Sequence, residues 1–90
     1  MKTLRLINKA ESVILEYRNL ELLSKDERTA KMKFVVDPEY SIDPEHPDYI
    51  VFTVFSDGLV NKHDFEWCPE KECYTEEGYT TWQVLEEEGA

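Results

Sequence analysis

Residues 49–59, Tyr-Ile-Val-Phe-Thr-Val-Phe-Ser-Asp-Gly-Leu, decide the fold of this chain. The segment 49–55 is aromatic, aliphatic or β-branched on both faces, as in a central strand of a sheet. Asp57 and Gly58 follow, a pair favoured in tight hairpin turns because both residues tolerate a positive φ. The sequence therefore predicts a hairpin over 49–67, with 59–67 as its return strand.

The return strand alternates between two faces. Phe65 and Trp67 share one face, and Lys62, Asp64 and Glu66 share the other. Same-face residues of a strand repeat about every 6.6 Å, close to the spacing of alternate phosphates along one DNA strand, about 6.8 Å. Asp64 and Glu66 therefore fit a surface that imitates a nucleic-acid backbone. The simpler interpretation is a solvated acidic face, since every polar strand face shares this spacing.

Alternating segments on both sides of the hairpin predict further strands. Ala30, Met32 and Phe34 alternate with lysines over 29–36, which indicates a half-buried strand. Residues 3–6 and 79–85 alternate in the same way, and 86–90 is expected to be a frayed tail. We expect one all-β domain over residues 1–90, a mainly antiparallel sheet of about five or six strands curled or folded on itself.

Residues 10–23 fit two structures. Asn8 is a suitable cap for a helix whose apolar stripe begins at Ala10, which gives the alternative fold class, α+β with one helix near 10–24 packed on the sheet. A strand with a bulge near Arg18 and Asn19 instead explains why the apolar positions switch from odd to even numbers. We favour the strand.

The segment 37–48 contains three prolines, which deny it ladder donors and predict a loop. Its acidic side chains occupy alternate positions, as the ligands of a calcium-binding loop do. The sixth position is Ile42, where a calcium loop requires glycine, and the twelfth is Asp48 in place of a bidentate glutamate. We therefore do not expect a specific calcium site.

Charge is divided unevenly along the chain. Residues 1–36 carry eight Lys/Arg and five Asp/Glu, a net of +3, and residues 37–90 carry two and fifteen, a net of −13, which together give −10. Such a chain repels nucleic acid and anionic membranes and favours basic partners. It has no long apolar run, no pattern of a signal peptide and no disulfide framework, so we expect a cytoplasmic protein with reduced thiols.

Cys68 and Cys73 form a C-x4-C pair, with His63 nearby and His46 in the loop. Zinc sites usually have two to four residues between paired ligands, and no second pair exists, so we expect no metal and no other cofactor. Glutamates flank both thiols, and negative charge raises a thiol pKa, which opposes activation as a nucleophile. We expect no enzymatic activity.

These observations predict a non-enzymatic acidic protein that binds a basic protein surface, as an inhibitor or nucleic-acid mimic. Small, acidic chains without motifs are common among phage and mobile-element accessory proteins, an analogy of type and not of residues. The alternative is a structural subunit that self-associates, for instance as a homodimer, through a basic segment with Lys25, Arg28, Lys31 and Lys33 and the acidic second half. The expected partner-binding residues are Asp57, Asp64, Glu66, Trp67, Glu70, Glu72, Tyr74, Glu76 and Glu77.

Overall fold

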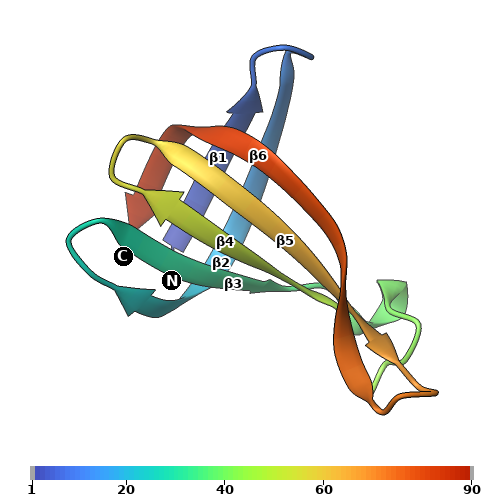
Figure 1. Cartoon of the computed structure of the whole chain (residues 1–90). Coiled ribbons are helices and arrows are strands. Elements are labelled where there is room, and N and C mark those ends of the chain that lie inside the picture. Colours follow the sequence, from blue (N-terminus) through green and yellow to red (C-terminus); the bar gives the residue numbers. More distant parts are fainter. Residues whose placement is uncertain (1, 90) are drawn as a thin grey trace.

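The computed structural model describes residues 2–89 of the chain, and the side chains of residues 2–85. Six antiparallel strands close into a barrel in which each strand pairs with its neighbours in sequence and β6 returns to β1 (Figure 1). The strands are β1 (Lys2–Asn8), β2 (Val13–Lys25), β3 (Thr29–Val35), β4 (Tyr49–Phe55), β5 (Leu59–Cys68) and β6 (Cys73–Gly89). Among the described residues, no helix is long and apolar enough to cross a membrane.

Two long strands take part in both halves of the barrel. β2 pairs with β1 through 13–20 and with β3 through 21–25. β6 pairs with β5 through 73–83 and with β1 through 83–89. The barrel is therefore closed at the end with the 26–28 and 56–58 turns, and at the other end the β1–β2 and β5–β6 hairpins diverge as two arms (Figure 1).

β2 confirms the strand interpretation of residues 10–23, and the alternative helix is wrong. The register between β1 and β2 shifts between the Leu4–Tyr17 pair and the Lys2–Leu20 pair, which places a bulge at Arg18 and Asn19. Asn19 has a φ of 60°, a conformation that asparagine tolerates better than most residues. The bulge lets Tyr17 and Leu20 both face the barrel interior, which a regular strand would not allow.

The core lies between the two halves of the barrel, and no polar side chain among residues 2–85 is fully buried. Phe52 is at its centre, with no exposed surface, and Tyr17 contacts its ring at a centroid distance of 4.9 Å. The other buried side chains are Leu4, Leu6, Leu20, Met32, Ile50, Val54 and Val60.

The predicted hairpin over 49–67 and the strand over 29–36 are confirmed as β4–β5 and β3. The turn at 56–58 has Gly58 at a φ of 93°, which glycine adopts without strain. The expected last strand, 79–85, is too short, because β6 begins at Cys73 and its backbone pairs with β1 as far as Gly89. The expected frayed tail is therefore wrong for 86–89, and Ala90 lies outside the described residues.

Candidate protein-interaction site

Two acidic segments that are distant in sequence lie against each other at the open end of the barrel. One is the 37–48 loop, and the other is the part of the β5–β6 arm that extends beyond the barrel, residues 66–77 (Figure 1). We call them together the acidic pole. Each segment contributes five Asp/Glu, ten in all, against a single lysine, Lys71. Like charges at this density produce a strong negative potential.

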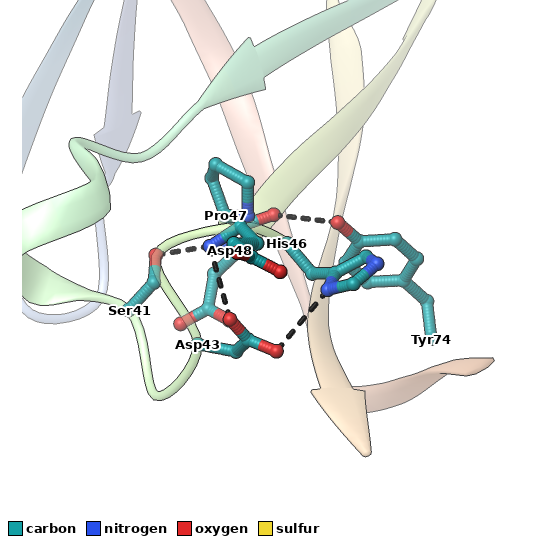
Figure 2. Close-up of polar contacts among 7 residues, drawn as sticks. Ser41, Asp43, His46, Pro47, Asp48 and Tyr74 are labelled. Carbon is teal, nitrogen blue, oxygen red and sulfur yellow. Dashed lines mark hydrogen bonds and ion pairs between the residues drawn. The ribbon is translucent and has the colours of Figure 1, made fainter. Parts of the chain in front are cut away.

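The 37–48 loop has a defined structure of its own. Asp37 caps a short 3-10 helix, Pro38–Tyr40, by accepting a hydrogen bond from the Glu39 N–H at 3.0 Å. The Ser41 hydroxyl accepts from the Asp48 N–H at 2.9 Å and joins the two sides of the loop (Figure 2). The Val36 N–H donates to the Asp48 carbonyl at 2.9 Å and closes its base.

Asp43 holds a second turn within this loop. Its carboxylate accepts from the Glu45 N–H at 2.9 Å and lies 3.1 Å from Nδ1 of His46 (Figure 2). The backbone hydrogen bond from Glu45, followed by the contact with His46, lowers the pKa of Asp43 below its ordinary value. These contacts fix the orientation of the His46 ring.

Aromatic side chains attach the loop to the β5–β6 arm. The His46 ring stacks on Trp67 with a centroid distance of 3.8 Å and an interplanar angle of 6°. The Tyr74 hydroxyl donates to the Pro47 carbonyl at 3.0 Å (Figure 2), and the Tyr74 ring meets Trp67 edge-on at 5.1 Å. We call His46, Pro47, Trp67 and Tyr74 the aromatic clamp. Aromatic pairs of this kind stabilise by about 0.5–1.5 kcal/mol beyond the area they bury.

Tyr49 connects the aromatic clamp to the barrel. It stacks on Phe65 at 4.9 Å, contacts Tyr74 edge-on at 4.8 Å and lies 4.5 Å beneath Nζ of Lys33. Partial burial of Tyr74, together with the nearby Tyr49, Asp48 and Asp43, raises its pKa above the ordinary tyrosine value. Trp67 and Tyr74, which the sequence assigned to the partner, thus hold the acidic pole together.

The carboxylates of the arm point to solvent. Glu66, Glu70, Glu72, Glu76 and Glu77 are all exposed. Two of them have neighbours, since Glu76 lies 2.7 Å from Nδ1 of His63 and the Thr75 hydroxyl donates to Glu77. The structure therefore gathers five of the expected carboxylates on one arm.

Asp64 is held differently. Val60 enters the core, so strand alternation turns Lys62 and Asp64 toward the barrel interior, and the aromatic face of β5 lies outside under the loop. Nζ of Lys62 contacts the two carboxylate oxygens of Asp64 at 2.9 and 3.0 Å. Gly78 stands opposite, where an added Cβ would lie 3.0 Å from the Asp64 carboxylate. The predicted row of Asp64 and Glu66 thus has one member in an ion pair.

Asp57 lies away from the other expected residues. It sits in the 56–58 turn at the closed end of the barrel and accepts a hydrogen bond from the Leu59 N–H at 3.0 Å. The length of β5, about 30 Å at the usual rise per residue, separates it from the tip of the β5–β6 arm.

The sequence analysis missed the contribution of the 37–48 loop to this surface. The sequence does contain a proline-rich acidic loop and a strand with two aromatic residues on one face. The contact between them is tertiary, however, and no local pattern predicts it. A hollow of about 340 Å³ lies beside the end of the loop and the start of β4, lined partly by Asp48, Asp64, Glu66 and Glu77. One carboxylate oxygen of Asp48, Oδ1, is buried with no hydrogen-bond partner among the described residues.

Cys68 and Cys73 are opposite each other on β5 and β6 as free thiols. His46 and His63, the other members of the possible zinc set, contact Asp43 and Glu76. Within the described part of the chain, no group of three His, Cys, Asp or Glu is arranged to hold a metal ion.

The basic segment does not neutralise the acidic pole. Among the described residues, none of Lys25, Arg28, Lys31 and Lys33 forms an ion pair with the second half of the chain. Nζ of Lys33 lies 4.5 Å from the centroid of the Tyr49 ring, which borders the pole.

Comparison with protein-family models, with curated proteins and with solved structures finds no match to this chain. Function is therefore argued from the geometry of the acidic pole.

Proposed function

We propose that this chain is a non-enzymatic interaction protein whose acidic pole binds a basic surface of a partner protein and blocks or adapts it. The observation that carries this proposal is the joining of two acidic segments by the aromatic clamp, with ten carboxylates against one lysine. Solubility alone requires exposed charges but does not require that two remote acidic segments be held together. Electrostatic steering by such a surface speeds association and makes it dependent on salt.

The acidic lining of the hollow beside Asp48 also supports a basic partner. Asp48, Glu66 and Glu77 line this hollow, which has room for the end of a lysine or arginine side chain. Arginine in particular presents several donors in a planar fork that suits a carboxylate.

Two variants of equal charge test the proposal. The pole variant replaces Glu66, Glu70, Glu72 and Glu77 with glutamine, and leaves Glu76 beside His63. The matched control replaces Glu11, Glu21 and Glu27 with glutamine and Asp57 with asparagine, all outside the acidic pole. Each variant loses four carboxylates, so both change the net charge from −10 to −6.

The experiment is capture of proteins from extract by the immobilised chain, followed by affinity measurement with the captured basic protein. We expect binding to the original chain and the control, loss of binding to the pole variant, and at least a tenfold weaker affinity between about 50 mM and about 500 mM NaCl. An affinity that is indifferent to salt, or equal for both variants, contradicts the proposal.

Self-association remains the second candidate. The uneven division of charge that motivates it is present, but the structure adds no contact that favours it. We therefore treat self-association as an alternative result of the experiments. Light scattering over a range of concentrations would reveal it as growth of the particle size.

A further inference from the structure

The β5–β6 arm has a free strand edge. β6 pairs with β5 through 73–83 but with β1 only from 83 onward, so over 73–82 its other side has no strand partner among residues 2–89. The exposure of its side chains agrees, since the consecutive residues Tyr79, Thr80 and Thr81 are all exposed although they alternate between faces. A covered strand such as β4 has no exposed residue.

The alternation of backbone hydrogen bonds along β6 shows which N–H and C=O groups this edge presents. The Val84 N–H donates to the Gly58 carbonyl at 2.8 Å. In an antiparallel ladder, residues alternate between directing both backbone groups to one neighbour and to the other. Even-numbered residues over 78–84 therefore face β5, and Tyr79 and Thr81 direct their N–H and C=O groups to the free edge.

We propose that this edge receives an extended basic segment of a partner protein as an added strand beside Tyr79–Trp82. The added strand would lie in line with β1, whose pairing with β6 ends at the Ile7–Gln83 pair. This inference rests on the proposed function, because it gives the form in which the basic partner is bound. Backbone hydrogen bonds would provide affinity, as in other cases of strand addition.

Charge decides the occupant of the edge. Glu76 and Glu77 are exposed on β6 immediately before Gly78, and Glu72 lies at the tip of the same arm. A second copy of this chain carries a net charge of −10, so its approach is opposed, whereas lysine or arginine at alternate positions of an added strand is attracted. Charges and bulges often keep natural edges unpaired, and here the same carboxylates also select a basic strand.

β2 has a comparable free edge over 13–19, on the side away from β1. Its exposed charges, Glu16 and Arg18, pair with each other at 3.0 Å. That edge therefore has no charge preference, and the inference applies to β6.

The probe is a short peptide that alternates lysine with threonine, and its control alternates lysine with proline. Both have the same charge, but proline lacks the N–H group that a ladder requires. The variants are Thr81→Pro, which removes an N–H directed to the free edge, and Thr81→Val, which keeps it. Because the register directs this N–H away from β5 and toward the free edge, we expect Thr81→Pro to fold.

We expect the lysine–threonine peptide to bind the original chain and Thr81→Val, and to bind Thr81→Pro at least about tenfold more weakly. Its binding should slow the hydrogen exchange of the Tyr79 and Thr81 amides in the original chain. This second measurement keeps the proposal testable if Thr81→Pro does not fold. The lysine–proline peptide should bind all forms weakly and equally.

Unchanged exchange at Tyr79 and Thr81, or equal affinity of a folded Thr81→Pro and Thr81→Val, overturns the added strand. If both peptides then still bind in a salt-dependent way that the pole variant loses, the proposed function stands without it. If neither peptide binds, the inference fails, and the proposed function is then decided by its own capture experiment. A dimer that Thr81→Pro dissociates would instead assign the edge to a second copy and overturn the proposal.

Discussion

The two arms of the barrel share a topology but are stabilised differently. Both arms begin in the core, since Leu4, Leu6 and Leu20 of the β1–β2 arm are at most 1% exposed and Val60 of β5 is fully buried. The β5–β6 arm extends past the core, and beyond Phe65 it is supported on its outer face by the 37–48 loop through the aromatic clamp. The apolar burial of the β1–β2 arm thus lies at its base, whereas the end of the β5–β6 arm depends on a local contact between two acidic segments.

This difference implies that the acidic pole opens more easily than the barrel. Local opening requires less free energy where few apolar side chains are buried, whereas core strands open only with global unfolding. In the acidic pole, like charges also oppose the contact that the aromatic clamp maintains. A basic partner would reduce that repulsion, so binding and closure of the loop should favour each other.

The largest expected effect comes from the β1–β2 arm. Leu6→Ala leaves a cavity in the core and should lower the free energy of unfolding by about 2–5 kcal/mol. Ile7→Ala, on the outer face of the same strand, should cost less than half as much, since Ile7 is only partly buried. Urea denaturation followed by circular dichroism measures both. Equal losses would show that the arm is not anchored through its inner face.

Removing the aromatic clamp should have a smaller and more local effect. Trp67→Ala should cost about 1–3 kcal/mol, because Trp67 is half-buried between His46 and Tyr74. Hydrogen exchange should accelerate in the 37–48 loop while β1 and β4 keep their protection. Tyr40→Ala is the control, since Tyr40 lies in the same loop but is 79% exposed. Uniform acceleration throughout the barrel would contradict a separable acidic pole.

Most of the strands could be predicted because they depend on local pattern. The 49–67 hairpin follows from an apolar run with Asp57 and Gly58 after it. The β2 bulge at Arg18 and Asn19 follows from the change of the apolar positions from odd to even numbers. Strand alternation, however, does not tell which face is inside. On β5 the position of Val60 decides it, and it turns Lys62 and Asp64 inward.

The acidic pole could be predicted only in part. Sequence proximity gathered the glutamates of residues 66–77 correctly on one arm, but it also included Asp57, which the length of β5 removes to the other end. The stacking of His46 on Trp67 joins residues on different elements, and no local pattern specifies that contact. The end of β6 was missed because pairing with β1, a long-range partner, maintains it, and its beginning, 73–78, because pairing with β5 continues through polar residues.

The smallest expected effect is a response of the loop to acid. The pKa of Asp43 in the folded chain lies below the unfolded value of about 3.9, chiefly because the Glu45 N–H donates to its carboxylate. The ionised form is thus the one that the fold stabilises. This contribution is present above the unfolded pKa and is lost as the pH falls through the folded value. The loop should therefore loosen below about pH 4, which an NMR titration of the Glu45 amide would detect.

Asp26 at the closed end provides the matched control for this titration. Its carboxylate accepts from the Thr29 and Arg28 N–H groups, which likewise lower its pKa. Asp43→Asn should remove the acid response of the Glu45 amide and leave that of Thr29 unchanged, and Asp26→Asn should do the reverse. Because the two turns lie at opposite ends of the barrel, a response of both amides to either substitution would mean that the acidic pole and the closed end open together, as one unit.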